Sequence, residues 1–303
     1  MSITLKGAFG HSFQVDLRAL LQLTKPTISM LVVFTAWPSL VMAGDSLPSI
    51  SMVFLCSLGI FMASGSAAVL NHIVDSDIDA NMVRTRRRPI PSGKTTPLQS
   101  IFFSLCLGLG SFALLYYKCG PLAAWLSVVA NFFYVFVYTV YLKRRTSQNI
   151  VIGGAAGAVG PLIGWAAITN SLSWEAWVLF AVIFLWTPPH FWALALKYKD
   201  DYAAVNVPML PNVKGEAVTR RDILLYSISL VPTVLSLYIF GEAREIYMVV
   251  SLAATFGFCY LAYRLWKRKS IEYAMPVFFF SLAYIFIVFG SLLIDQLVYK
   301  ISL

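Results

Sequence analysis

The chain has 303 residues, of which 59% are hydrophobic and only 12% charged, and its mean hydropathy is +0.75. This apolar content exceeds what the core of one soluble domain can bury, so the composition excludes an ordinary soluble protein and predicts an integral membrane protein. The formal net charge of +9 reflects a bias of basic residues toward one side of the membrane, and we expect no nucleic-acid partner.

Nine apolar stretches have about the length that crosses the hydrocarbon core of a bilayer, which predicts an all-α bundle of nine transmembrane helices. They are residues 26–43, 50–70, 98–117, 121–142, 150–169, 176–196, 223–240, 246–263 and 273–294. With a cytoplasmic N-terminus, 20 of the 23 lysines and arginines lie on the cytoplasmic side, as the positive-inside rule requires. We therefore expect a cytoplasmic segment, residues 1–25, and a single transmembrane domain, residues 26–303.

The second stretch runs directly into a motif in which Asn71, Asp75 and Asp79 recur every four residues. On a helix this spacing places the three side chains on one face, within an arc of roughly 80°. Oxygen ligands at this spacing suit Mg²⁺, which takes one or two protein carboxylates and is completed by substrate phosphate oxygens. The motif predicts a magnesium site for a diphosphate, and a solvated loop with unrelated charges is the alternative.

Four arginines follow this motif closely, at positions 84, 86, 87 and 88. The planar fork of arginine pairs bidentately with phosphate or carboxylate, so we expect Arg84 and Arg88 to belong to a catalytic site. Anchoring to anionic lipid headgroups is the competing interpretation for any one of them.

The fourth stretch ends in a run from Tyr138 to Thr146 that contains Lys143. Aromatic residues and snorkelling cations at the membrane interface would explain this run without any function. Because the run lies on the same side as the acidic motif, we also expect Tyr138 and Lys143 to contribute to substrate binding.

The sixth stretch carries Pro188 and Pro189 directly before His190. Paired prolines interrupt the helical hydrogen-bond ladder and leave backbone groups to a cavity or a neighbouring helix. A histidine beside such a kink is a candidate catalytic base or iron ligand, although most single histidines are packing residues.

Together these motifs resemble those of the UbiA superfamily of intramembrane prenyltransferases. The likeness rests on the motif from Asn71 to Asp79, the Tyr-Thr-x-x-Leu-Lys-Arg run that begins at Tyr138, and the nine-span layout. Four further motifs are similar to those of one branch, the protohaem IX farnesyltransferases or haem O synthases. They are Arg84-Thr-x-x-Arg88-Pro89, Pro-Pro-His-Phe-Trp at 188–192, Lys-Asp-Asp-Tyr at 199–202 and Val-Pro-Met-Leu-Pro at 207–211.

The resemblance implies that farnesyl diphosphate and haem B are the substrates and that haem O is the product. It further implies Mg²⁺ as the cofactor and a multi-pass protein in the lipid of a bacterial inner membrane, with the active site facing the cytoplasm. The product would pass to a haem-modifying enzyme or a terminal oxidase.

The chain departs from the superfamily in one respect. Members of the superfamily carry a second aspartate-rich motif after the sixth span. Alignment through Asp200 and Asp201 puts His190 and Lys197 where two aspartates are expected. We therefore do not expect a second Mg²⁺ site. Instead, Lys197, Asp200 and Asp201 are expected to bind substrate, and His190 to face the porphyrin.

Two other functions remain open at this point. A UbiA-type enzyme with an aromatic acceptor, such as a hydroxybenzoate or a chlorophyll precursor, shares the first motif but would be expected to keep the second aspartate cluster. A transporter also places polar residues inside a helical bundle. It would carry charges deep in its spans, whereas nearly all charges here lie at one membrane face.

Overall fold

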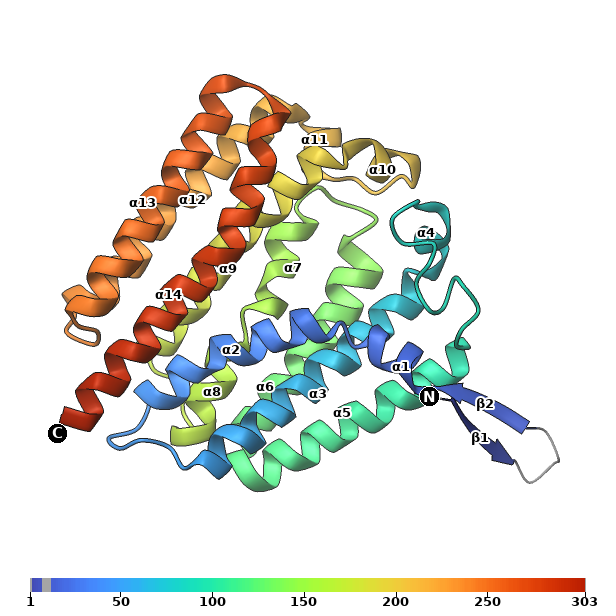
Figure 1. The fold of residues 1–303 in the computed structure, drawn as a ribbon, viewed down its shortest axis with the longest axis horizontal. Coiled ribbons are helices and arrows are strands. Elements are labelled where there is room, and N and C mark those ends of the chain that lie inside the picture. Colours follow the sequence, from blue (N-terminus) through green and yellow to red (C-terminus); the bar gives the residue numbers. More distant parts are fainter. Residues whose placement is uncertain (1, 7–11, 303) are drawn as a thin grey trace.

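The computed structural model describes residues 2–6 and 12–302. Residues 1 and 7–11 of the predicted cytoplasmic segment lie outside this part of the chain. The chain begins with a hairpin that the sequence analysis did not predict: strand β1 (Ser2–Lys6) pairs antiparallel with strand β2 (Ser12–Asp16). The hairpin projects from the helical bundle, on the right in Figure 1.

All further elements are helices. They are α1 (Leu17–Leu23), α2 (Pro26–Met42), α3 (Ile50–Val74), α4 (Ser76–Asn81), α5 (Pro97–Cys119), α6 (Pro121–Phe132), η1 (Phe133–Leu142), α7 (Asn149–Gly157), α8 (Gly160–Thr169), α9 (Trp174–Lys197), α10 (Lys199–Ala204), α11 (Leu210–Val213), α12 (Gly215–Ile239), α13 (Glu245–Arg268), η2 (Ile271–Tyr273) and α14 (Ala274–Ser302).

Eight helical stretches among the described residues are long and apolar enough to cross a membrane. A ninth is obtained if α1 and α2, which are bent by 51° at their junction, count as one span. The predicted all-α bundle is thus confirmed, and the stretches lie close to the predicted positions. The main differences are that α12 begins at Gly215 instead of residue 223 and that α14 ends at Ser302 instead of residue 294.

Local sequence explains where the helices begin and how closely they pack. Helix α5 starts at a capping box, in which the Thr96 hydroxyl accepts from the Gln99 N–H at 3.2 Å and the Gln99 side chain accepts from the Thr96 N–H at 3.1 Å. Helix α8 packs against α2 because Gly164 lets the backbones approach: a Cβ there would lie 2.6 Å from the Ala36 carbonyl oxygen.

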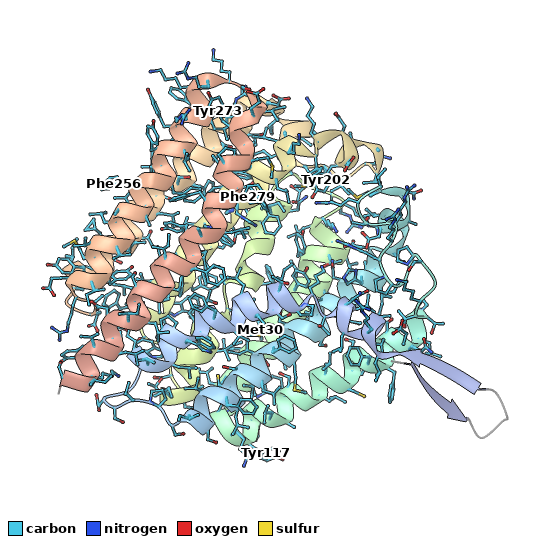
Figure 2. The ribbon with its side chains drawn as sticks, viewed as in Figure 1. Met30, Tyr117, Tyr202, Phe256, Tyr273 and Phe279 are labelled. Atoms are coloured by element: carbon cyan, nitrogen blue, oxygen red, sulfur yellow. The ribbon has the colours of Figure 1, made fainter. Side chains whose placement is uncertain are left out.

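Large apolar side chains cover the outside of the bundle. Tyr117, Phe256 and Phe279 are exposed and project from their helices (Figure 2). Such an outer surface fits contact with lipid tails and not with water.

The short helices α4, α10 and α11 gather at one end of the bundle, at the upper right in Figure 1. We call this the loop end. The junction of α1 and α2 also reaches it, through Lys25, whose backbone adopts the left-handed conformation (φ 48°) and whose ammonium contacts α3.

Candidate active site

The acidic motif lies where α3 passes into α4. The Asp75 N–H donates to the Asn71 carbonyl at 2.9 Å, and the Asp79 N–H donates to the Asp75 carbonyl at 2.8 Å. The helical spacing therefore continues through the break between α3 and α4. The side chains of Asn71, Asp75 and Asp79 are all buried, with 3%, 1% and 3% of their residue surface exposed.

Each of these three side chains is paired with a cation from another part of the chain. Lys143 pairs with Asp75, and the Lys25 ammonium donates to the Asn71 side-chain oxygen at 2.7 Å. Arg88 Nη1 donates to both Asp79 carboxylate oxygens, at 2.8 and 2.7 Å. Pairing with a carboxylate reduces the cost of burying the charges of Lys143 and Arg88, whereas burial beside a neutral amide lowers the pKa of Lys25 to about 7.

The loop after α4 turns back so that Arg88 can reach Asp79. The Thr85 hydroxyl donates to the Asp79 carbonyl at 3.0 Å, and the Arg88 N–H donates to the Thr85 carbonyl at 2.9 Å. Burial acts to raise the pKa of Asp79, but nearby His72 and the hydrogen bonds from Arg88 outweigh it and hold the pKa below its ordinary value. His72 Nδ1 lies 3.7 Å from the Asp79 carboxylate.

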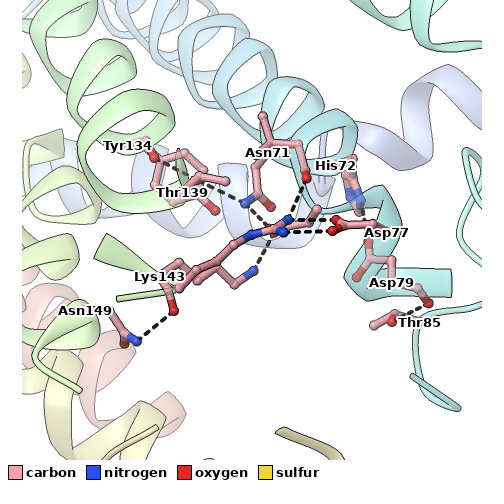
Figure 3. A network of polar contacts seen from close by, with 12 residues as sticks. Asn71, His72, Asp77, Asp79, Thr85, Tyr134, Thr139, Lys143 and Asn149 are labelled. Carbon is pink, nitrogen blue, oxygen red and sulfur yellow. Dashed lines mark hydrogen bonds and ion pairs between the residues drawn. The ribbon is translucent and has the colours of Figure 1, made fainter. Parts of the chain in front are cut away.

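Helix η1 supplies the wall opposite α3. It is π-helical, and the Lys143 N–H donates to the carbonyl of Tyr138, five residues earlier, at 2.8 Å. The Thr139 hydroxyl donates to the Tyr134 carbonyl at 2.8 Å and accepts from the Asn71 side chain at 3.1 Å. Figure 3 shows Asn71, Thr139 and Lys143 in one network. The π-helical segment, a rare form that is frequently found at functional sites, ends where Lys143 lies beside Asp75.

One oxygen of the acidic cluster has no partner within the described part of the chain. Asp75 Oδ2 accepts from Asn71 and Lys143, whereas Asp75 Oδ1 is buried without a hydrogen bond. A buried acceptor left in this state costs free energy and is available to a ligand. No group of three His, Cys, Asp or Glu side chains that could hold a metal occurs among the described residues. Two carboxylates and an amide nevertheless fit Mg²⁺ if substrate oxygens complete its shell.

Arg84 does not reach the acidic cluster through any of its described contacts. Its guanidinium lies over the rings of Tyr198 and Tyr202, at 5.1 and 5.7 Å from their centroids. It also donates to the Tyr202 hydroxyl at 3.3 Å. Arg84 therefore connects the loop after α4 with α10.

His190 is buried in α9, which continues through Pro188 and Pro189 as one helix. Its ring is stacked between Trp186 and Phe278, with centroid distances of 4.6 and 4.7 Å. Its Nδ1 lies 2.7 Å from the Ser281 hydroxyl of α14. None of the contacts described for His190 joins it to the acidic cluster.

The three other candidates on this side of the protein are less enclosed. Lys197 and Asp200 are exposed and Asp201 is half-buried, and none of them forms an ion pair within residues 12–302. The neighbouring Lys199 instead pairs with Glu216 of α12 at 2.6 Å. The structure thus brings together Asn71, Asp75, Asp79, Arg88 and Lys143, with Tyr138 beside them, but not Lys197, Asp200 or Asp201.

Comparison with known proteins decides the family. The chain matches the UbiA prenyltransferase family over residues 32–286. It belongs to this family. The predicted enzyme class, a prenyltransferase, is therefore confirmed.

Several relatives of this UbiA family member are similar along nearly their whole length. A protoheme IX farnesyltransferase of Microcystis aeruginosa is 45% identical over 278 residues, which cover 91% of this chain and 88% of the relative. One of Brucella melitensis is 45% identical over 289 residues, covering 94% of this chain and 92% of the relative.

Solved structures share the fold at much lower identity. A digeranylgeranylglyceryl phosphate synthase superposes with a TM-score of 0.78 at 18% identity, covering 92% of this chain and 98% of that one. A UbiA homolog from Archaeoglobus fulgidus bound to GPP and Mg²⁺ gives a TM-score of 0.65 at 15% identity, covering 90% of this chain and 99% of that one.

Sequence reasoning about this family member missed two residues of the cluster and its surroundings. Lys25 was counted only as a positive charge before the first span, although a lysine directly before Pro26 and an apolar stretch marks a charged group at the bundle entrance. Arg144, next to Lys143, was not singled out either. It pairs with Asp77, at 2.7 Å, and lines a cavity of about 560 Å³ at the loop end.

Proposed function

We propose that this protein transfers the farnesyl group of farnesyl diphosphate to a vinyl group of haem B, with addition of water, giving haem O and diphosphate. The observation that carries the proposal is the 45% identity to protoheme IX farnesyltransferases over nine tenths of the chain, 91% in the first comparison. The buried cluster of acids and cations supports it, because a diphosphate is the kind of group that such a cluster can hold.

Farnesyl diphosphate, haem B and water together supply every atom of haem O and diphosphate. Cleavage of the bond between C1 and the diphosphate oxygen leaves an allylic farnesyl cation and diphosphate. The terminal carbon of the vinyl group bonds to C1, and a cation forms on the vinyl carbon next to the porphyrin ring. Water adds to that carbon and loses a proton, for which the departing diphosphate is an adequate acceptor.

The cations of the cluster stabilise the negative charge that develops on the leaving group. Lys143 and Arg88 are held in place before substrate arrives, by Asp75 and Asp79 respectively, and Lys25 lies beside them on Asn71. Charges that are fixed in advance need no reorganisation during the reaction, which makes their effect on the barrier large.

We also propose that Asn71, Asp75 and Asp79 hold Mg²⁺ when a prenyl diphosphate is bound. The unpaired Asp75 Oδ1 supports this assignment, as does the UbiA homolog bound to GPP and Mg²⁺. Bound Mg²⁺ would neutralise the diphosphate and so make it a better leaving group. Asn71 can become a ligand of Mg²⁺ only if its side-chain oxygen gives up the hydrogen bond from Lys25.

The remaining candidates are proposed to act on the acceptor or to complete the substrate site. His190, held by Ser281 and two aromatic rings, would face the porphyrin. Tyr138 would line the farnesyl site beside Lys143. Asp200 and Asp201 would approach the substrate only if α10 moves toward α4, and Lys197, the last residue of α9, would contact the substrate beside them.

We further propose that the loop end faces the cytoplasm of a bacterial cell, with the protein in the inner membrane, and that haem O passes to a haem-modifying enzyme or a terminal oxidase. The positive-inside bias supports the orientation. Single cysteines at Ser92 and Asn212, in a variant without native cysteines, should react only with reagents that reach the cytoplasm. Labelling of Asn212→Cys from outside would contradict the orientation.

The reaction itself is tested by mass analysis of porphyrins after purified protein is incubated with haem B, farnesyl diphosphate and Mg²⁺. We expect a haem heavier by one farnesyl group and one hydroxyl group. Incubation with a hydroxybenzoate in place of haem is the control for the aromatic-acceptor alternative. Farnesylation of the hydroxybenzoate but not of haem would replace the proposal by that alternative.

A further inference from the structure

Lys143 and Arg144, which directly follow η1, form ion pairs with two different carboxylates. Lys143 pairs with Asp75, whose side chain is 1% exposed, whereas Arg144 pairs with Asp77, whose side chain is 62% exposed. One pair is thus buried among the residues proposed to hold diphosphate, and the other lies at the surface one step along the chain.

The outer pair borders a cavity of about 560 Å³ between α4 and the end of α10. Its polar lining comes from Asp77, Asn81, Arg144 and Asn206, and its apolar lining includes Ile78 and Val205. A cavity with both kinds of lining fits the edge of an amphipathic molecule that carries an anionic group.

Arg144 has hydrogen-bonding capacity left for a ligand. Its Nη1 donates to Asp77 at 2.8 Å, and its Nη2 donates to Asp77 at 2.7 Å and to the Val74 carbonyl at 3.0 Å. A guanidinium has five N–H donors, so these three bonds leave two unused. The guanidinium is also accessible, since 39% of the Arg144 side chain is exposed.

The two arginines that the sequence analysis expects in the catalytic site have their described partners outside this cavity. Arg88 is held by Asp79, and Arg84 lies over Tyr198 and Tyr202. Arg144 is the arginine that lines this cavity.

We propose that Arg144 binds a carboxylate of the acceptor in this cavity, and that Asp77 is the internal anion that the carboxylate displaces. The inference rests on the proposed function, in which the acceptor is haem B and the carboxylate is one of its propionates. One carboxylate replaces another on the same guanidinium, and the displaced Asp77 remains in water, so the exchange leaves no buried charge unpaired. The contact would place the porphyrin beside the diphosphate site, because Lys143 is the adjacent residue.

The test compares haem B with its dimethyl ester, in which both propionates are blocked, as acceptors at saturating farnesyl diphosphate. We expect the wild-type protein to prefer haem B in kcat/KM, and Arg144→Gln to reduce this preference by about 10-fold, the usual effect of one charge-assisted contact. The KM for farnesyl diphosphate should stay the same. Arg145→Gln is the matched control, because Arg145 carries the same charge but lies over Tyr141, and it should keep the wild-type preference.

Asp77→Asn separates binding from a merely structural ion pair. If the pair only stabilises the fold, Asp77→Asn and Arg144→Gln lose the same interaction and should change activity in the same direction. If Arg144 binds the acceptor, removal of the competing carboxylate should increase the preference for haem B, opposite to the effect of Arg144→Gln. Arg144→Lys, which keeps the charge, should retain part of the preference.

The outcomes distinguish this inference from the proposed function. Equal use of haem B and its ester by the wild-type protein, an unchanged preference in Arg144→Gln, or parallel losses in Arg144→Gln and Asp77→Asn would each overturn the role of Arg144 while farnesyl transfer to haem stands. Absence of any farnesylated haem from the wild-type protein would overturn both.

Discussion

The two acidic segments at the loop end have similar composition but opposite environments. Asp75 and Asp79, on the α3–α4 side, are buried and each is paired with a cation, Asp75 with the distant Lys143 and Asp79 with Arg88 of the loop after α4. On the α10 side, Asp200 is exposed and Asp201 is half-buried, neither forms an ion pair within residues 12–302, and the neighbouring Lys199 pairs with Glu216 of α12.

This difference indicates which segment is prepared for a ligand before the ligand binds. Buried charges are expensive, so a protein keeps them mainly where they have a function. Exposed carboxylates cost little and require no such explanation. We therefore expect substitutions on the α3–α4 side to affect catalysis strongly, and those on the α10 side to have smaller effects.

The largest contrast should come from matched carboxylate-to-amide substitutions. Asp75→Asn removes the charge that pairs with Lys143 and the proposed metal ligand, and we expect farnesyl transfer to fall on the order of 100-fold or more. Asp200→Asn should have little effect. Turnover in membranes at limiting Mg²⁺ measures both. Comparable losses in the two variants would show that burial does not distinguish the segments.

A second contrast concerns the two lysines. Lys143→Gln should lower kcat/KM for farnesyl diphosphate by about 10- to 100-fold, because it removes a charge-assisted contact to the leaving group. Lys197→Gln should lower it by about 10-fold at most, since Lys197, the last residue of α9, is exposed and forms no ion pair within residues 12–302. The measurement is steady-state kinetics with folded protein confirmed by gel filtration. A larger effect at Lys197 would reverse the proposed order.

His190 lies in α9, away from the acidic cluster, but it is buried. Its substitution therefore tests whether burial or proximity to the cluster determines how strongly a variant loses activity. We expect His190→Ala to weaken the use of haem by about 10-fold through loss of the contact with Ser281 and of the ring stack, with the KM for farnesyl diphosphate unchanged. Haem titration by absorbance and kinetics with each substrate varied provide the measurement. An altered KM for farnesyl diphosphate alone would remove His190 from the acceptor side.

Arg84 connects the two segments, and its loss should loosen one from the other. Arg84→Gln removes cation–π contacts that are worth about 0.5–1 kcal/mol at exposed sites, so limited proteolysis within residues 198–206 should become several-fold faster. Arg87, which is exposed nearby, supplies the control as Arg87→Gln. Identical digestion rates in the two variants would mean that Arg84 does not hold the segments together.

The smallest expected effect is that of pH on two ion pairs at the loop end, Arg144 with Asp77 and Lys199 with Glu216. Arg144 lowers the pKa of Asp77 from its ordinary 3.8. This pair therefore stabilises the fold above about that pH and is lost as pH falls through the lowered value. Glu216 raises the pKa of Lys199 from its ordinary 10.5, so that pair persists at lower pH and is lost only as pH rises through the raised value. The same proteolysis assay should give constant rates from about pH 5 to 9, and a transition inside this range would contradict the pairing.

The sequence predicts well the features that depend on neighbouring residues. Spacing by four residues placed Asn71, Asp75 and Asp79 on one helix face, and runs of apolar residues located the spans. Partners separated by many residues could not be predicted in this way. Nothing in local spacing indicates that Lys25 reaches Asn71, 46 positions away.

Two details of correctly predicted spans, the start of α12 and the helical form of η1, were not predicted for other physical reasons. The first turns of α12 carry the charged residues Glu216, Arg220, Arg221 and Asp222. A hydropathy pattern therefore does not reveal that this helix begins before the apolar stretch. Helix η1 is π-helical. Its periodicity differs from that of the α-helix, which is the periodicity assumed when helices are predicted from a sequence pattern.

Lys25 has a backbone that most residues avoid. A left-handed conformation at a residue other than glycine or asparagine costs about 1 kcal/mol, and at φ 48° Lys25 carries this cost at the bend between α1 and α2. A glycine at this bend would avoid the cost but would carry no side chain. The Lys25 side chain instead reaches the Asn71 oxygen of α3, so the strained bend also fastens the start of the bundle to the acidic motif.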